Sequence, residues 1–143
     1  MERTFRLFVA EEDGEPVVYT EEMLEGMDEP ALVAAFGPAA RWHTITLRPP
    51  VFSLQEEAKR RSLIADKDRG FVVDPCALPI ERARAMVQAW TFDAPPGELD
   101  AIPLEAANLI DNRIQQAMYP TAFRNQGFTK ALQHRAAPSA TPD

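Results

Sequence analysis

Proline limits the length of the elements that this chain can form. Thirteen of its 143 residues are proline, and a proline ring removes a backbone donor and cannot continue a strand or the interior of a helix. Pro49 and Pro50 follow a strand-like apolar run, while Pro79 and Pro103 fall near the starts of helical runs. The chain is therefore expected to fold into several short elements instead of a few long helices.

The first 40 residues predict a β-hairpin followed by two short helices. "TFRLFVA" (4–10) has strand-like alternation, "EDGEP" has turn composition, and "VVYT" is a second strand. "EEMLEGMDEPALVAAFG" is helical in character, with acidic residues in its first turn, where the helix dipole favours them. Gly26 and the run from Asp28 to Pro30 are expected to divide it, and Gly37-Pro38 to end the second helix.

A strand and a capped helix are predicted next. In "RWHTITLRP" (41–49) alternate side chains fall on opposite faces, with His43, Ile45 and Leu47 on one of them. Ser53-Leu54-Gln55-Glu56 matches the S-x-x-E capping box, in which the two side chains satisfy backbone amides at the helix start. We therefore expect a helix over 54–66, and then a turn and a short extended segment in "DRGFVVDP".

Two further helices follow from apolar residues at helical spacing. "LPIERARAMVQAW" predicts a helix over 78–90, with a buried stripe of Ile80, Ala83, Val87 and Trp90. "DAPPGELDA" (93–101) predicts a loop. "IPLEAANLIDNRIQQAMYP" predicts a helix that starts near Pro103 and buries Ala107, Ile110, Ile114 and Ala117. A last short helix is expected in "TAFRNQGFTKALQ", which precedes a small, proline-rich tail.

These elements predict an α+β fold made mainly of short helices, with a small N-terminal hairpin or sheet. The length fits one domain over 1–134, with an acidic part (1–40) and a helical part (53–133), followed by a flexible tail over 135–143. Residues 1–40 hold ten acidic and two basic side chains, whereas the remainder is nearly neutral. This acidic part would repel phosphate backbones, so we expect no binding of nucleic acid.

No motif names a reaction, a metal or a cofactor. The cysteine Cys76 and the two histidines, His43 and His134, show no nucleophile, metal or nucleotide pattern. A Cys76–His43 nucleophilic pair is the one enzymatic arrangement to consider, and "VDPCALP" places no basic neighbour beside Cys76. We therefore expect a non-enzymatic protein without metal or cofactor. No apolar run reaches the ~20 residues that a membrane span needs. The stretch "MERTFRLFVAEEDGE" has no apolar core long enough for a secretory signal, so we expect a protein of the cytosol.

Three stretches resemble one family of phage proteins. They are "ITLRPPVFSLQEEAKRRS", with an R-P-x-x-F-x-x-x-E start, "IERARAMVQAWTFD", and "DAPPGELDAIPLEAANLIDNRI". Together they cover about residues 44–118, and they resemble the tail assembly chaperones of long-tailed bacteriophages. The resemblance implies a non-enzymatic chaperone in the host cytoplasm, whose partners are the tape-measure protein or tail-tube subunits. A homo-oligomer is compatible with it.

The resemblance further implies a groove that covers the apolar face of a client helix. We place five side chains nearest that groove: Trp90, Ile110, Ile114, Met118 and Phe123. Two other functions remain open at this point. One is a structural virion component, such as a neck, head-completion or capsid-associated subunit. The other is an acidic adaptor or regulatory protein that binds a host protein.

Overall fold

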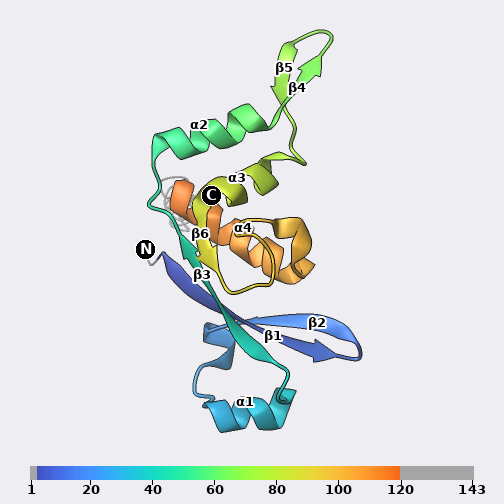
Figure 1. The fold of residues 1–143 in the computed structure, drawn as a ribbon, viewed down its shortest axis with the longest axis vertical. Coiled ribbons are helices and arrows are strands. Elements are labelled where there is room, and N and C mark those ends of the chain that lie inside the picture. Colours follow the sequence, from blue (N-terminus) through green and yellow to red (C-terminus); the bar gives the residue numbers. More distant parts are fainter. Residues whose placement is uncertain (1–2, 120–143) are drawn as a thin grey trace, which may run out of the picture.

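The computed structural model describes residues 3–119, and it confirms the α+β fold (Figure 1). Its main sheet is antiparallel and has the strand order β2-β1-β3-β6, while β4 and β5 form a separate hairpin. In chain order the elements are β1 (Thr4–Glu12), β2 (Glu15–Thr20), η1 (Glu22–Leu24), α1 (Glu29–Phe36), β3 (Arg41–Leu47), α2 (Phe52–Arg61), β4 (Leu63–Asp66), β5 (Gly70–Val73), α3 (Leu78–Met86), β6 (Val87–Trp90), η2 (Leu99–Ala101) and α4 (Leu104–Met118).

The N-terminal hairpin is confirmed, and its turn explains why. Glu12 pairs with Glu15, so Asp13 and Gly14 alone make the loop. Both residues have positive φ, 54° and 82°, as a two-residue hairpin turn whose twist matches the strands requires. The two short helices after the hairpin are confirmed as η1 and α1, which lie on either side of Gly26. Asp28 caps α1 by accepting a 3.0 Å hydrogen bond from the Ala31 N–H.

Strand β1 is buried on both faces, so the main sheet has two apolar layers. Phe5 and Leu7 face α3 and α4, where the larger core lies, while Phe8 and Ala10 face α1 in a smaller core. The predicted alternation in β3 is confirmed, because Ile45 and Leu47 are buried in the larger core and Trp42 packs on the smaller one. Residues 3–40 thus contribute β1 and β2 to the sheet, and α1 packs in its smaller core.

The predicted capping box is wrong. Helix α2 begins at Phe52, its N-cap is Val51, and no side chain caps it. The chain is extended at Val51 (φ −132°, ψ 152°), and the helix starts as soon as the two prolines have passed. Ser53 therefore lies inside the first turn, where its hydroxyl cannot act as an N-cap. Leu54 and Ala58, which share one face of α2, do turn inward, since Ala58 is buried and Leu54 packs on the core.

The predicted end of this helix at 66 is also wrong, because residues 63–66 form β4. The Ser62 hydroxyl donates a 2.7 Å hydrogen bond to the Ala58 carbonyl at the end of α2. The Asp66 carboxylate then accepts hydrogen bonds from the N–H groups of Asp68 and Arg69, at 2.8 and 3.2 Å, and Gly70 has φ +81°. This turn pairs β4 with β5, the extended segment that the sequence did predict.

The helix predicted over 78–90 is confirmed for its first nine residues, and its last four form a strand instead. It ends at Met86, and Val87–Trp90 form β6, the sheet edge next to β3. Val87 and Trp90, placed on the helical stripe by the sequence, instead pair with Leu47 and Ile45. The Arg48 N–H also donates a 2.7 Å hydrogen bond to the Met86 carbonyl. Pairing with the open edge of β3 is therefore favoured over continuation of the helix at residues 87–90.

Helix α4 is confirmed with its buried stripe. It starts directly after Pro103, and the predicted inward side chains are buried: Ala107, Ile110, Ile114 and Ala117. The loop predicted over 93–101 is confirmed, apart from the short η2 turn at its end. The helix predicted in "TAFRNQGFTKALQ" and the tail over 135–143 lie outside the described residues.

Candidate partner-binding surface

The structure places Cys76 and His43 in unrelated settings. His43 stacks on Phe92 with ring centroids 4.1 Å apart, and its Nδ1 lies 3.2 Å from the Thr91 hydroxyl. Burial and the charge of Arg41 lower the His43 pKa. Cys76 is exposed, and its backbone N–H donates to the Asp74 carboxylate. His43 is thus held by its strand neighbours and does not bond to a nucleophilic thiol.

Between residues 3 and 119, His, Cys, Asp and Glu side chains nowhere gather in threes that could hold a metal ion. None of the helices described there combines the length and apolar character that a membrane span would need.

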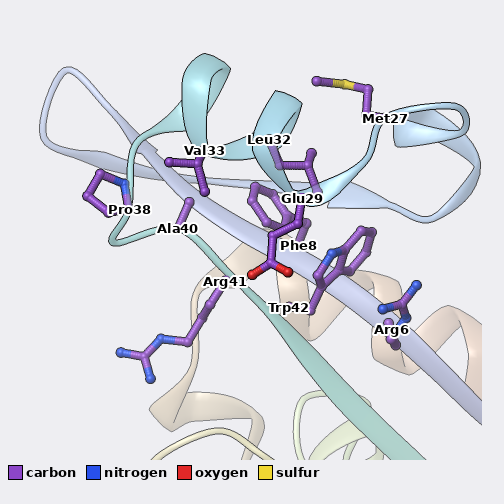
Figure 2. A pocket seen from close by; sticks show the side chains of 10 residues that line it. All are labelled: Arg6, Phe8, Met27, Glu29, Leu32, Val33, Pro38, Ala40, Arg41 and Trp42. Carbon is purple, nitrogen blue, oxygen red and sulfur yellow. The ribbon is translucent and has the colours of Figure 1, made fainter.

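A hollow of about 550 Å³ lies between α1 and the main sheet (Figure 2). Phe8 and Trp42 form its floor, in edge contact with ring centroids 5.1 Å apart. Leu32 and Val33 of α1 line it from the other side. The hollow is thus the seam along which α1 packs on the sheet, and Arg6, Glu29 and Arg41 share its lining with the apolar side chains.

The charged groups around this hollow do not converge on one point. The Arg6 guanidinium stacks over Trp42 at 4.3 Å and is paired with Glu21 at 3.5 Å. Glu29 points from α1 toward the floor, whereas the Arg41 side chain extends away from the hollow (Figure 2). Within residues 3–119 neither Glu29 nor Arg41 forms an ion pair. A catalytic or anion-binding set would need such groups to face each other.

Exposed apolar side chains are concentrated in another part of the molecule. Nine large apolar residues are exposed in the described chain, and six of them fall within residues 51–73, which include α2 and the β4–β5 hairpin. These six are Val51, Phe52, Leu63, Ile64, Phe71 and Val73. Figure 1 shows α2 and the hairpin at the end of the molecule opposite α1. Val51 and Phe52 lie at the start of α2, whereas the other four lie on the hairpin beyond its end. Exposed apolar groups gathered in this way are typical of protein-binding sites.

Phe52 is the most exposed aromatic side chain of this region, at 74%. It lies at the first position of α2, where two shallow hollows meet. One is lined along α2 by Ser53, Glu56, Glu57 and Arg60, and the other is lined by Pro50, Val51, Gln55 and Met118. We call this area, with Phe52 at its centre, the α2 surface. It combines an apolar centre with a charged rim, an arrangement common in protein interfaces.

The five predicted partner-binding residues do not form one surface. Ile110 and Ile114 have no exposed area and belong to the chain's own core. Their burial contradicts the prediction that they lie beside a client groove. Trp90 is half-buried, packs against that core and donates a 2.8 Å hydrogen bond to the Ala94 carbonyl. Met118 does reach the α2 surface, and Phe123 lies outside the described residues.

The sequence reasoning missed Phe52 and the apolar hairpin residues. A signal for Phe52 was present, because it falls off the stripe of Leu54 and Ala58 that faces the core. A second signal was the run "GFVV" (70–73), which follows the turn-forming "DKDR" too closely to belong to a long buried strand.

No family model, curated protein or solved structure matches this chain.

Proposed function

We propose that this protein is a non-enzymatic assembly chaperone of a bacteriophage tail. Its clients would be the tape-measure protein or the tail-tube subunits before they assemble. The observation that carries the proposal is Phe52, a 74% exposed aromatic side chain on a helix whose outer face is otherwise charged. Phe52 and Glu56 are also the F and E of the R-P-x-x-F-x-x-x-E stretch on which the resemblance to tail assembly chaperones rests.

The α2 surface suits an amphipathic helix as its client. Such a helix needs its apolar face covered until it meets its final neighbours, and a short groove beside a helix can supply that cover. Phe52 would fill a gap between two turns of the client, while Val51 and Met118 extend the apolar contact. Glu56 and Arg60 on the rim offer charges of both signs, which orient a client more than they tighten its binding.

The weak energy of such a contact fits a factor that must release its client. Full burial of a Phe side chain stabilises by roughly 1.5–3 kcal/mol. Since about three-quarters of Phe52 is exposed, covering it would contribute about 1–2 kcal/mol. A client held by a few contacts of this size can be displaced when tail-tube subunits polymerise around it.

Co-expression with a tape-measure protein tests the proposal. The wild-type chain should raise the soluble fraction of this client, and Phe52→Ser should remove most of that effect. Leu104→Ser is the matched control, because Leu104 is 77% exposed but lies at the start of α4, outside the α2 surface. Equal losses from the two variants, or none from Phe52→Ser, would contradict the role of this surface.

A second measurement addresses the chaperone role itself. An assembly factor leaves when the tail is complete, so the chain should be absent from purified particles. Its presence there in stoichiometric amounts would contradict the proposal and would favour a structural subunit.

A further inference from the structure

The β4–β5 hairpin is the part of the described molecule with the least support from its own chain. None of its strand residues belongs to either core cluster, and its extensive contacts are those between its two strands. It projects beyond α2 and away from the main sheet (Figure 1). A two-stranded hairpin is marginally stable in water and usually gains stability from further strands or from packing on one face.

One face of the hairpin is entirely apolar. Leu63 pairs with Val73 and Ala65 pairs with Phe71, and directly opposite residues in an antiparallel pair point to the same face. All four side chains are exposed, Phe71 at 72%. The charged residues of the hairpin are confined to its tip, where Asp66 and Asp68 alternate with Lys67 and Arg69. The face thus carries no net charge that would repel a like surface.

The same four residues carry the free backbone groups of the hairpin. The Asp74 N–H donates a 2.8 Å hydrogen bond to the Ser62 carbonyl, which fixes the alternation of hydrogen-bonded pairs along the ladder. The pair Ile64–Val72 must then bond inward, whereas the N–H and C=O groups of Phe71 and Val73 point outward from the edge of β5. An open edge of this kind is a template for another strand.

We propose that two copies of this chain associate by antiparallel pairing of their β5 strands. With Val72 at the two-fold axis, Phe71 of each copy lies opposite Val73 of the other. The outward groups of these residues then exchange four hydrogen bonds. The apolar faces of both hairpins join on one side of a four-stranded sheet. This inference does not depend on the proposed chaperone function.

Charge favours β5 over β4 as the pairing edge. Pairing of two β5 strands sets Asp74 opposite Gly70 of the second copy, with Arg69 as the next residue, so unlike charges approach. Pairing of two β4 strands about Ile64 would instead bring Lys67 of the turn toward the end of α2, whose last turn holds Lys59, Arg60 and Arg61, and like charges that approach each other repel. A contact between four-residue strands is smaller than the roughly 1,200–2,000 Å² that stable complexes bury. We therefore expect a weak dimer that forms at high protein concentration.

Sedimentation velocity between about 10 μM and 1 mM, a range chosen for weak affinities, gives the first test. The wild-type sedimentation coefficient should rise toward that of a dimer over this range, and Val73→Pro should remain a monomer. Proline at 73 removes an outward donor but no bond within the hairpin, and edge positions tolerate it. The control Ala65→Pro makes the same change on the outer edge of β4, and it should still dimerise.

Disulfide trapping tests the register. In a Cys76→Ser background, Val72→Cys should give a covalent dimer with diamide as the oxidant. The two Cα atoms would lie about 4.5 Å apart, within the range for disulfides. Ile64→Cys, in the same background, would leave its thiols about three strand spacings apart, roughly 14 Å, and should not be trapped.

A wild-type chain that stays monomeric at 1 mM would overturn the inference. Equal dimerisation of Val73→Pro would also overturn it, as would trapping of Ile64→Cys instead of Val72→Cys. If Val73→Pro abolished binding of the tape-measure protein while wild type alone stayed monomeric, the edge would bind a client strand and not a second copy.

Discussion

Replacing Gly97 with alanine tests how closely the 93–101 loop packs against α3. Gly97 has φ +90°, and a Cβ atom built on it would lie 2.6 Å from the Ala83 carbonyl oxygen and 2.7 Å from the Arg84 Cα atom. These are backbone atoms of a helix, so they cannot move aside as a flexible side chain would. The next residue, Glu98, is fixed by two hydrogen bonds from the Arg84 guanidinium, at 2.7 and 3.0 Å.

The cost of Gly97→Ala has two parts. A left-handed backbone costs a residue with a Cβ atom roughly 1–2 kcal/mol, and forcing an extra carbon into a filled space costs roughly 1–3 kcal/mol. We therefore expect the free energy of unfolding to fall by about 2–5 kcal/mol. The matched control is Gly14→Ala, because Gly14 also has positive φ (+82°) but no atom within 4 Å of its added Cβ. Gly14→Ala should therefore lower the free energy of unfolding only by the backbone part, roughly 1–2 kcal/mol.

Urea unfolding at 25 °C, followed by circular dichroism, measures both variants. The difference between them isolates the steric part and should be about 1–3 kcal/mol. In thermal melts this corresponds to a gap of roughly 3–12 °C for a chain of this length. If Gly97→Ala were no more destabilising than Gly14→Ala, the loop would not lie against α3 as described, and the reasoning would be refuted.

Two further predictions concern stability. Ile114→Ala should lower the free energy of unfolding by about 2–5 kcal/mol, because Ile114 has no exposed area. The folded variant should bind its client with unchanged Kd. A loss of binding without a loss of stability would contradict the assignment of Ile114 to the core. The hydrogen bonds from Arg84 lower the pKa of Glu98 below its ordinary value of 4.5. The Glu98 carboxylate is therefore protonated at higher pH in the unfolded chain than in the folded one. Because of this difference, the free energy of unfolding should fall as the pH drops below about 4.5. Arg84→Gln should flatten this acid-side fall in the urea midpoint, and an equal fall in both proteins would count against the pairing.

The parts of the fold that were predictable from sequence are those that local chemistry determines. Asp13-Gly14 can adopt the two positive φ values that a tight hairpin needs, so the first two strands were found. The stripe that includes Ile110 and Ile114 has strict helical spacing and follows a proline, so α4 was found with its buried face.

The errors arose where a partner distant in sequence decides the structure. Val87 and Trp90 continue the helical spacing of α3, and only the open edge of β3 draws them into a strand. The candidate surface was missed for a related reason. Ile114 and Phe52 are both large apolar residues on helices, and their neighbours in space, not their own chemistry, bury one and expose the other.

Titration of the purified protein with a tape-measure segment, followed by isothermal calorimetry, tests the central claim most directly. The account predicts saturable binding that Phe52→Ser weakens roughly 5- to 30-fold, which corresponds to the loss of about 1–2 kcal/mol. Leu104→Ser should bind as wild type does. Absence of binding, or equal Kd values for wild type and Phe52→Ser, would contradict the account.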